Sequence, residues 1–482
     1  MQTLRQERSL PKSDMRATGG PDITLRPYQA DDVARLRAAF TEFFRVCYVM
    51  ATGGGKTIVF TFIAQSAVSR GKRVLIVAHR QEICEQISAA LAAMRIEHAL
   101  IAPGRAPSDC AVQVAMVGTL VRRLGEQPHF DLIVVDEAHH SAAASWKRIL
   151  AAFPKARVLG VTATPERRDG KPLDMFQEMV IGPDTRTLIE QGYLTPFVMY
   201  APGDAPDLSE IGLRGGDYDV GELDAVVNNG MVIDSAIAHY SKICPGKPAI
   251  AFCVTIEHSK AVAKAASRAG FRAQHVDGAT PPKKRRALIK ALGAGKLDIL
   301  TNCDLISEGT DIPVVTTAIL LRPTKSISLH LQQLGRVLRL APGKSEAIIL
   351  DCVGNLDRLG PPDAVRGWSL KGRKKRDARP LEVMKFLRRC PACWRINGRG
   401  TVVCACGEAL TPTAEEIRIE AMARVFTPPM RDQIRGMTYW AACEWARDDV
   451  ERLRQVARAR GYRTAWVAFR LRELRERRGA DG

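Results

Sequence analysis

The stretch Cys47-Tyr-Val-Met-Ala-Thr-Gly-Gly-Gly-Lys-Thr57 is the segment from which the fold of this chain can be inferred. The apolar run 46–50 predicts a short buried strand, and the apolar-rich run 58–67 predicts a helix. Between them lie three consecutive glycines, followed by Lys56 and Thr57. Glycines let backbone N–H groups crowd around a phosphate, and a helix N-terminus adds partial positive charge. The stretch therefore predicts a phosphate-binding loop.

Lys56 and Thr57 give this loop its expected chemistry. The ammonium of Lys56 can reach the β- and γ-phosphates of a nucleotide, and the hydroxyl of Thr57 can hold Mg²⁺. The usual form of such loops has a glycine where this chain has Met50. This departure leaves an alternative open, in which the segment is only a glycine-rich turn before an ordinary helix.

A second strong signal is the apolar run 132–135, which is followed by Asp136-Glu-Ala-His139. The run predicts a buried strand with two carboxylates at its carboxyl end. Hydrolysis of a phosphoanhydride needs Mg²⁺ on oxygen ligands and a carboxylate that positions water. We expect Asp136 to hold the metal and Glu137 to orient the attacking water. The alternative is a pair of surface charges.

Polar residues also follow other predicted strands. Helical and apolar-strand patterns alternate along the chain, which favours α/β layers around mainly parallel sheets. Ligands of such sheets bind at the carboxyl ends of the strands. We therefore expect Arg80 and Thr119 to contact a nucleic-acid backbone, although both could simply be solvated. Thr162 and Thr164 are expected to sense phosphate and relay its presence to a neighbouring domain, or else to form a turn.

Upstream of the glycine loop, Leu25-Arg-Pro-Tyr-Gln29 precedes a helical pattern. The carboxamide of Gln29 offers a donor and an acceptor, so it can recognise the edge of an adenine base, with Tyr28 stacking nearby. The alternative is a helix entry with Pro27 near its first turn.

The second half of the chain contains a string of evenly spaced polar residues. Gln332, Arg336 and Arg339 are three or four positions apart, so on a helix they would share one face. A guanidinium supplied from another domain stabilises the charge that develops on the γ-phosphate oxygens during phosphoryl transfer. An ordinary basic helix face is the alternative.

Taken together, these strings resemble the motifs of superfamily 2 helicases. The strings and the motifs that they resemble are Met50-Ala-Thr-Gly-Gly-Gly-Lys-Thr57 (I), Asp136-Glu-Ala-His139 (II), Thr162-Ala-Thr164 (III), Ser307-Glu-Gly-Thr-Asp-Ile-Pro313 (V), Gln332-Gln-Leu-Gly-Arg-Val-Leu-Arg339 (VI) and Arg26 to Gln29 (the upstream glutamine element). Gln333 and Leu338 depart from many members of the family. This departure points away from DEAD-box RNA helicases and towards DNA-directed branches.

The resemblance implies ATP and Mg²⁺ as cofactors, together with a set of site residues. The catalytic residues would be Lys56, Asp136, Glu137 and the arginine fingers Arg336 and Arg339. The nucleotide would contact Arg26, Gln29, Thr52, Gly53, Gly54, Gly55, Lys56, Thr57, Asp136, Gly309, Asp311 and Gln332, with Thr57 and Asp136 holding Mg²⁺. Arg80, Thr119 and Thr301 would meet nucleic acid, and His139, Thr162 and Thr164 would couple hydrolysis to movement.

The twelve cysteines fall into two groups. Eight lie far apart in mostly apolar contexts, which indicates reduced core thiols of a cytoplasmic protein. The other four predict a tetrahedral Zn²⁺ site, with a disulfide pair as the alternative. They are Cys390, Cys393, Cys404 and Cys406. A single residue separates the last two, which puts one ligand in doubt, and four thiolates would make the site structural rather than catalytic.

The length of the chain indicates the number of domains, and its net charge indicates the kind of partner. A chain of 482 residues suggests roughly three domains. The net charge of +19 predicts a polyanionic partner, nucleic acid before an anionic membrane, or else a solvated basic surface. No long apolar run predicts a membrane span. The polar N-terminus lacks the apolar core of a signal peptide and is expected to be disordered.

The sequence thus predicts an α/β fold: two tandem RecA-like P-loop domains, a small zinc-ribbon-like element and a helical, basic C-terminal region. The expected parts are a disordered lead (1–22), an ATP-binding domain (23–192), a second domain (193–370), a basic linker (371–389), a zinc element (390–407) and a helical region (408–482).

The arrangement resembles the RadD-like DNA-repair ATPases of bacteria and phages. That resemblance implies an ATP-dependent helicase or translocase that binds nucleic acid, DNA rather than RNA, in repair or recombination. Repair proteins or a single-strand-binding protein would be its protein partners, and no membrane partner is expected. Two alternatives stay open: the motor subunit of a restriction or defence system, and a zinc-stapled DNA-binding recruitment protein that uses ATP only as a switch.

Overall fold

The structure is a computed structural model that describes most of the chain. The described residues are 24–106, 108–140, 144–167, 170–203, 205–304, 314–372, 382–414, 416, 430–447, 449–462 and 465–480. The expected N-terminal lead, about half of the basic linker and the string Ser307 to Pro313 lie outside them. The chain forms two compact units, Met1–Leu410 and Thr411–Gly482, which are described separately.

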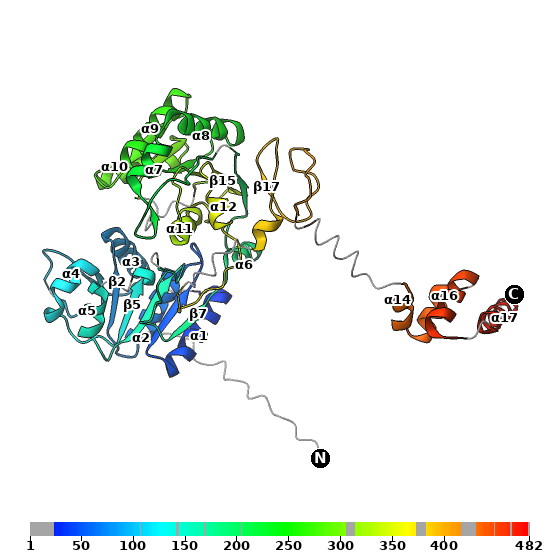
Figure 1. Ribbon diagram of the computed structural model, residues 1–482. Helices are drawn as coiled ribbons and strands as arrows, with labels where there is room; N and C mark the ends of the chain where they lie inside the picture. The colour runs from blue at the N-terminus through cyan, green and yellow to red at the C-terminus, as the bar shows by residue number, and fades with distance from the viewer. Residues whose placement is uncertain are drawn as a thin grey trace, which may run out of the picture. The chain divides into compact units, whose positions relative to one another are not determined.

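Seven parallel strands form the sheet of the first domain, in the order β3-β4-β2-β5-β6-β1-β7 (Figure 1). The strands are β1 (Arg45–Val49), β2 (Val74–Ala78), β3 (His98–Ile101), β4 (Val112–Met116), β5 (Leu132–Asp136), β6 (Arg157–Thr162) and β7 (Glu178–Ile181). The helices around them are α1 (Pro27–Glu42), α2 (Lys56–Val68), α3 (Gln81–Ala93), α4 (Val117–Arg122), α5 (Ala144–Ala152) and α6 (Thr185–Glu190), with the 3-10 turns η1 (Leu124–Glu126) and η2 (Ala138–His140).

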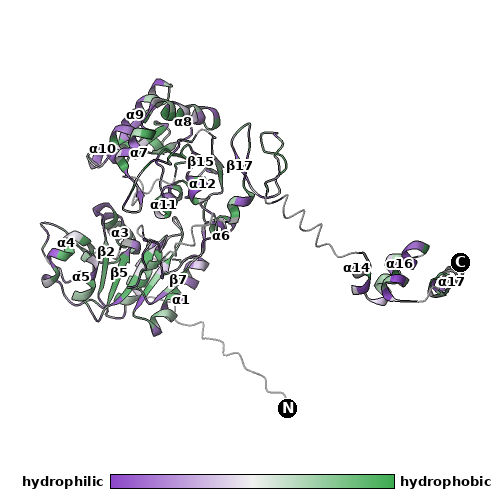
Figure 2. Cartoon of the chain, viewed as in Figure 1, coloured by the Kyte–Doolittle hydropathy of each residue, from purple (hydrophilic) through white to green (hydrophobic). Residues whose placement is uncertain are grey.

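Both faces of this sheet are covered, which explains why its strands are continuous apolar runs. Along β2, Val74 and Ile76 belong to one hydrophobic core, whereas Leu75 and Val77 belong to another. Successive side chains of a strand point to opposite faces, so the two cores lie on opposite sides of the sheet. These strands are coloured mainly as hydrophobic in Figure 2.

The second domain repeats this design with six parallel strands, in the order β12-β13-β11-β14-β15-β8. The strands are β8 (Phe197–Tyr200), β11 (Ala249–Phe252), β12 (Ala273–Val276), β13 (Ile299–Asn302), β14 (Thr317–Leu320) and β15 (Ala347–Asp351). The helices are α7 (Val220–Val227), α8 (Gly230–Ile243), α9 (Ile256–Arg268), α10 (Pro282–Gly293), α11 (Ile327–Val337) and α12 (Asn355–Leu359), and a short hairpin pairs β9 (Leu213–Arg214) with β10 (Asp217–Tyr218). The predicted α/β class with two parallel-sheet domains is confirmed.

Strand order in the first sheet gathers the predicted motifs. Strand β6 lies between β5 and β1, with Asp136 paired to Val161 and Val49 paired to Thr162. All three strands are parallel, so their carboxyl ends meet at one edge of the sheet. The glycine loop, the Asp-Glu pair and the two threonines therefore lie side by side because of the order of the strands.

The cysteine-containing element is part of the same unit as the two domains and contacts the second. It contains the turn η4 (Glu382–Phe386) and the paired strands β16 (Arg388–Arg389) and β17 (Ile396–Asn397). The N–H of Ala201, just after β8, donates to the Trp394 carbonyl at 3.0 Å. The ammonium of Lys242 lies 4.5 Å from the centre of the Trp394 ring, so the element also packs on α8.

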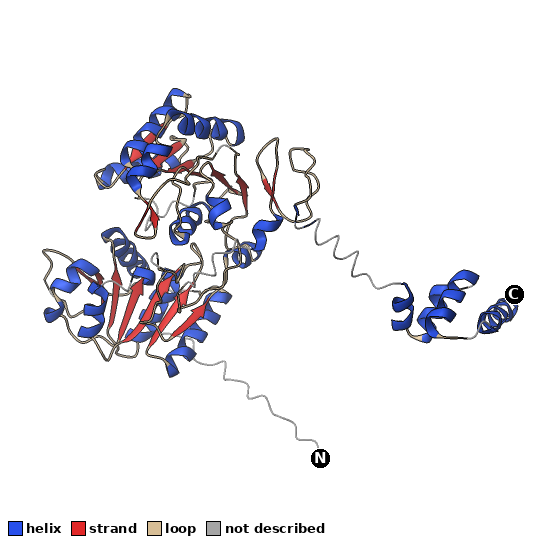
Figure 3. Cartoon of the chain, viewed as in Figure 1, coloured by secondary structure: helices blue, strands red, loops and turns tan. Residues whose placement is uncertain are grey.

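The second compact unit is helical, as predicted. It contains α14 (Met430–Gly436), α15 (Tyr439–Ala446), α16 (Val450–Arg460) and α17 (Ala465–Ala480), and its described residues form no strands (Figure 3). Ile434, Leu453 and Val456 form the centre of its own hydrophobic core.

No helix in the described part of the chain has both the length and the apolar character needed to cross a bilayer.

Candidate active site

The glycine loop has the backbone conformation that a phosphate cradle requires. Gly53 and Gly55 have φ angles of 88° and 86°, in the left-handed region that other residues adopt at a cost. Gly55 is the N-cap of α2, so Lys56 and Thr57 occupy the first turn of that helix. The unpaired N–H groups of the first turn are the anion-binding element of such loops.

Met50, where such loops usually have glycine, fits because two neighbouring glycines make room for it. A Cβ atom on Gly54 would lie 2.5 Å from the Met50 sulfur, and one on Gly182 would lie 2.5 Å from the Met50 Cε. Met50 itself is buried. The thioether therefore packs beneath the loop, and the departure from the usual pattern leaves the loop conformation intact.

Lys56 lies half-buried at the mouth of the loop. Its ammonium donates to the Met50 carbonyl at 3.2 Å. Burial lowers the pKa of Lys56, whereas the nearby carboxylates of Glu137 and Asp136 oppose this shift. A phosphate bound at this position would supply the negative charge that a buried ammonium needs.

The two carboxylates are held at the end of β5 in a strained turn. Glu137 has a φ of 50°, an uncommon value for a residue with a side chain, and its N–H donates to Asp136 Oδ1 at 3.0 Å. Backbone strain of this kind concentrates at functional sites. Both carboxylates lie on the same cavity as Lys56 and Thr57, where Mg²⁺ and a water could be held.

His139 contacts Glu137 and Thr162 of the first domain and Ser328 of the second. Its Nδ1 lies 3.3 Å from Glu137 Oε2 and 3.1 Å from the Thr162 hydroxyl. Its Nε2 lies 3.3 Å from the hydroxyl of Ser328, on α11 of the second domain. The Thr162 hydroxyl in turn donates to the Thr164 carbonyl at 2.9 Å. A continuous polar chain thus runs from the first domain to α11.

The second domain brings Gln332, Arg336 and Arg339 to the cavity that contains Lys56. This cavity measures about 540 Å³. Our prediction that all three lie on one helix was wrong for Arg339, because α11 ends at Val337. The Val337 carbonyl at the end of α11 accepts from Lys344 Nζ at 2.5 Å, and Arg339 enters the cavity from the residues that follow the helix.

The upstream glutamine element contacts the glycine loop directly. The Tyr28 hydroxyl donates to the Gly54 carbonyl at 2.9 Å, and Gln29 Nε2 lies 3.4 Å from the same oxygen. The Arg26 guanidinium lies 4.9 Å from the centre of the Tyr193 ring, and both residues line the cavity. Tyr193, next to Arg26, therefore gives this end of the cavity an aromatic surface against which a base could stack.

The described residues fit a bound nucleotide. Two buried side-chain atoms at the site, Thr52 Oγ1 and Gln332 Nε2, have no hydrogen-bond partner among the described residues. Unsatisfied buried polar atoms are costly unless a ligand supplies the partner. Lys56 together with Arg336 and Arg339 offers three cations to phosphate oxygens, and Thr57 with Asp136 offers the hard oxygen ligands that Mg²⁺ prefers.

The residues predicted to contact nucleic acid are not brought together on one surface. Arg80 caps α3 and donates to the Asp304 carbonyl of the second domain at 3.0 Å. Thr119 is buried in α4. Thr301 is fully buried and its hydroxyl donates to the Ser259 carbonyl at 2.7 Å, so in this conformation it cannot reach a nucleic-acid backbone. Gly309 and Asp311 lie outside the described residues.

Two contacts at this site were not predicted from the sequence. Ser328 was missed because its partner, His139, is 189 positions away. Tyr193 was missed because it lies at the boundary of the two predicted domains, as the first residue of the second, although an aromatic residue directly before Leu194-Thr-Pro196 was a usable signal.

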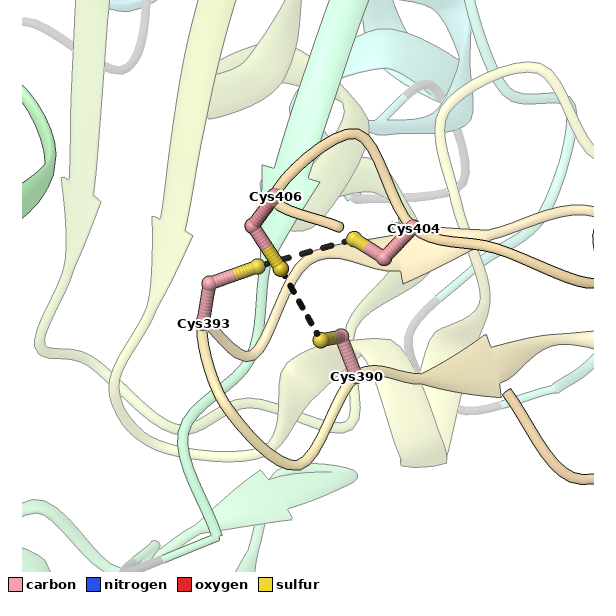
Figure 4. Close-up of side chains that lie close together, drawn as sticks. All are labelled: Cys390, Cys393, Cys404 and Cys406. Atoms are coloured by element: carbon pink, nitrogen blue, oxygen red, sulfur yellow. Dashed lines mark hydrogen bonds between the residues drawn. The ribbon is translucent and has the colours of Figure 1, made fainter. Parts of the chain in front are cut away.

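The four clustered cysteines form a separate candidate metal site (Figure 4). Their sulfur atoms all lie within 4.8 Å of one another, with Cys390 to Cys406 at 3.5 Å and Cys393 to Cys404 at 3.6 Å. A tetrahedral site with Zn–S bonds of about 2.3 Å has S–S edges of roughly 3.8 Å. The short Cys-x-Cys spacing thus still brings the fourth sulfur into the cluster.

The Cys404 thiol of the cluster has a lowered pKa, which favours the thiolate form that binds metal. Burial raises the pKa of Cys404, but the Cys406 backbone N–H and the neighbouring thiols outweigh it and lower the value to about 7. Asn397 Nδ2 also donates to the Cys404 sulfur at 3.7 Å. Such hydrogen bonds to a ligating atom orient it and stabilise its charge, so the cluster is compatible with Zn²⁺.

Comparison with known proteins agrees with this geometry. The family "Type III restriction enzyme, res subunit" matches residues 22–167, and "Helicase conserved C-terminal domain" matches residues 233–341. A 51.5 kDa protein of Lactococcus phage (isolate 7-9) is 32% identical over 77% of this chain and 79% of its own length. The candidate ATP-dependent helicase IRC3 of Saccharomyces cerevisiae is 31% identical over 68% of this chain. The chain spans about half of that yeast protein, with 51% of its length matched.

Among solved structures, the fold is similar to a fragment of a candidate HsdR subunit of a type I restriction enzyme from Vibrio vulnificus YJ016. The TM-score is 0.56 and the identity 22%, over 70% of this chain and 66% of the other. The fold and the site define a P-loop enzyme with two RecA-like domains. The chain belongs to superfamily 2 of the helicases, enzymes that hydrolyse ATP and bind nucleic acid.

Proposed function

We propose that this protein is a DNA-dependent ATPase that moves along DNA, and that it acts in DNA repair or recombination. The observation that carries the proposal is the mixed origin of one cavity. Lys56, Asp136 and Glu137 come from the first domain, whereas Arg336 and Arg339 come from the second. A site of this kind is complete only when the two domains are together, which couples hydrolysis to domain movement.

In the proposed reaction, Lys56 and the N–H groups of the α2 N-terminus bind the β- and γ-phosphates of ATP. Thr57 and Asp136 hold Mg²⁺, which neutralises charge on the phosphate oxygens. Glu137 orients the attacking water and accepts its proton. The water oxygen bonds to the γ-phosphorus as the bond to the leaving ADP oxygen breaks, which yields ADP and phosphate.

The second domain completes the reaction. Arg336 and Arg339 stabilise the charge that develops on the transferred phosphoryl group. The chain of contacts through His139 and Thr162 to Ser328 then carries the state of the site to α11. We assign the remaining cavity residues, including Gln29 and Gln332, to nucleotide binding, and the cysteine cluster to a structural Zn²⁺ site.

The proposal that DNA is the polymer rests on two supports. The net charge of +19 fits a phosphate backbone, and the family profile of the first domain is that of a restriction subunit, an enzyme class that acts on DNA. ATP hydrolysis should be measured with single-stranded DNA, double-stranded DNA, branched DNA and RNA. We expect stimulation by DNA above that by RNA, and equal or exclusive stimulation by RNA would overturn the choice.

A second candidate function is the motor of a restriction or defence system, which the family profile and the Vibrio structure favour. Apart from the four cysteines, no group of three or more residues suited to hold a metal is found in the part of the chain that the structure describes. Co-purification of a nuclease subunit from the native host would favour this function over repair.

A further inference from the structure

Lys344 lies in a tight turn that follows α11. The N–H of Lys344 donates to the Ala341 carbonyl at 3.1 Å, and Gly343 has a φ of 73°. Pro342 followed by a glycine with positive φ is the pattern of a type II turn. The turn reverses the chain and directs the Lys344 side chain back to the end of α11.

The ammonium of Lys344 donates to three main-chain carbonyls that belong to two segments of the chain. Val315 accepts at 2.7 Å, Val337 at 2.5 Å and Arg339 at 2.9 Å. An ammonium has three donors, so these contacts match its full capacity. Carbonyls at the C-terminal end of a helix carry partial negative charge, which favours a cation there.

The linker between the two domains, residues 191–196 between α6 and β8, also contacts the chain that follows α11. The N–H of Thr195 donates to the Leu338 carbonyl at 2.8 Å, and the Thr195 hydroxyl donates to the Arg339 carbonyl at 3.0 Å. The main chain of Arg339 is therefore held by two donors, one from the linker and one from Lys344. Its side chain reaches the nucleotide cavity.

Val315 connects this cluster to the motif V string. It lies two positions after Pro313, the last residue of the string that carries Gly309 and Asp311. The Lys344 ammonium thus bonds to Val315, just after that string, and to Val337 and Arg339, on either side of Leu338. Hydrogen bonds that one group makes to both segments can couple the positions of those segments.

We propose that Lys344 is a positioning residue: it fixes the main chain at Arg339, so that the guanidinium is correctly placed only when the chain at Val315 and at Thr195 is in place. This inference rests on the proposed function, in which Arg339 stabilises the transferred phosphoryl group. Lys344 does not line the nucleotide cavity.

Burial supports the assignment. Burial, and to a lesser extent the positive charge of Arg339, lower the pKa of Lys344 to about 8. A lysine held beside an arginine in a partly buried position is unfavourable unless its donors are satisfied. The three carbonyls provide that compensation.

The kinetic test compares Lys344→Met, which keeps the apolar stem, with Lys344→Arg, which keeps the charge. Lys296→Met is the control, since Lys296 is exposed in the same domain. We expect Lys344→Met to lower kcat for ATP about tenfold or more with KM changed less than about twofold, because a small displacement of a transition-state contact mainly affects kcat. Lys344→Arg should recover part of the loss. Equal losses in kcat and in the folded fraction would overturn the proposal.

A double variant isolates the path through Arg339. In an Arg339→Ala background, Lys344→Met should cause no further loss of kcat, because the group that it positions is absent. A full additional loss in that background would contradict the proposal.

Hydrogen exchange gives a readout that does not depend on hydrolysis. Lys344→Met should speed exchange of the Thr195 amide, which donates to Leu338, and leave the amides of β2 unchanged. Unchanged protection at Thr195 would overturn the inference about Lys344. Absence of ATP hydrolysis in the unaltered protein would instead overturn the proposed function, so the two failures are distinguishable.

Discussion

Gly335 of α11 touches Thr52 of the glycine loop across the two domains. A Cβ atom at position 335 would lie 2.3 Å from the Thr52 Cγ2 atom. Real Cβ atoms do not approach other heavy atoms this closely, so only glycine permits this contact. The helix that carries Arg336 thus lies directly against the loop that carries Lys56, and the size of one residue sets their separation.

The first prediction concerns this contact. Gly335→Ala should push α11 away from the loop and lower kcat for ATP by about 100-fold, because a shift of about 1 Å at the site is enough for that loss. DNA binding without nucleotide should be unaffected. Gly230→Ala is the matched control, since nothing lies within 4 Å of a Cβ atom there. Steady-state ATPase rates of the two variants test this prediction. Full activity of Gly335→Ala would contradict the described contact.

The second prediction concerns the water-orienting carboxylate. Glu137→Gln should lower kcat by at least about 100-fold, since loss of a general base has effects of that order. ATP binding should be retained, because Lys56 and the loop amides are unchanged. Glu190→Gln, at an exposed glutamate of the first domain, serves as the control. Retention of rapid hydrolysis in Glu137→Gln would remove this residue from the reaction.

The third prediction concerns Met50 and its space beneath the loop. Gly182→Ala would place a Cβ atom 2.5 Å from Met50 Cε and 2.7 Å from Asp32 Oδ2. Overpacking of this kind destabilises by about 1–3 kcal/mol. Adding Met50→Ala should relieve the clash with the thioether and recover part of the loss. Chemical denaturation of the single and double variants measures both effects, and additive losses would argue against the packing.

The fourth prediction concerns the cysteine cluster. Purified protein should contain one Zn²⁺ per chain, and Cys404→Ser should release it. Because the element is bonded to β8 through Ala201 and packs on α8 through Trp394, metal loss should also lower the thermal midpoint of the first unit. Cys110→Ser, outside the cluster, is the control. Elemental analysis showing no zinc in freshly purified protein would refute the assignment.

Much of this site was predictable because parallel strands converge at one edge. The positions of Lys56, Asp136 and Thr162 follow from three apolar runs and the polar residues after each. The location of Arg336 followed from its spacing to Gln332. Contacts between the domains could not be predicted this way, since they depend on how the second domain packs on the first.

The predictions that were wrong or missing also concern contacts between distant parts of the chain. Arg339 was assigned to the helix of Arg336 because spacing alone cannot show where tertiary contacts end a helix. Thr301 was expected to contact nucleic acid from the family resemblance, yet its buried hydroxyl donates to the Ser259 carbonyl on the neighbouring α9. The contact of Ser328 with His139 and the three bonds of Lys344 leave no local pattern in the sequence.

The central claim is that both domains supply the catalytic groups. ATP turnover stimulated by single-stranded DNA should be measured for the unaltered protein, Lys56→Ala and Arg336→Ala, with DNA affinity measured alongside. We predict that each substitution lowers stimulated kcat by about 1,000-fold or more, the order found for an arginine finger, while DNA binding is retained. Undiminished turnover in Lys56→Ala would refute the nucleotide site. Undiminished turnover in Arg336→Ala alone would show that the first domain works without the second.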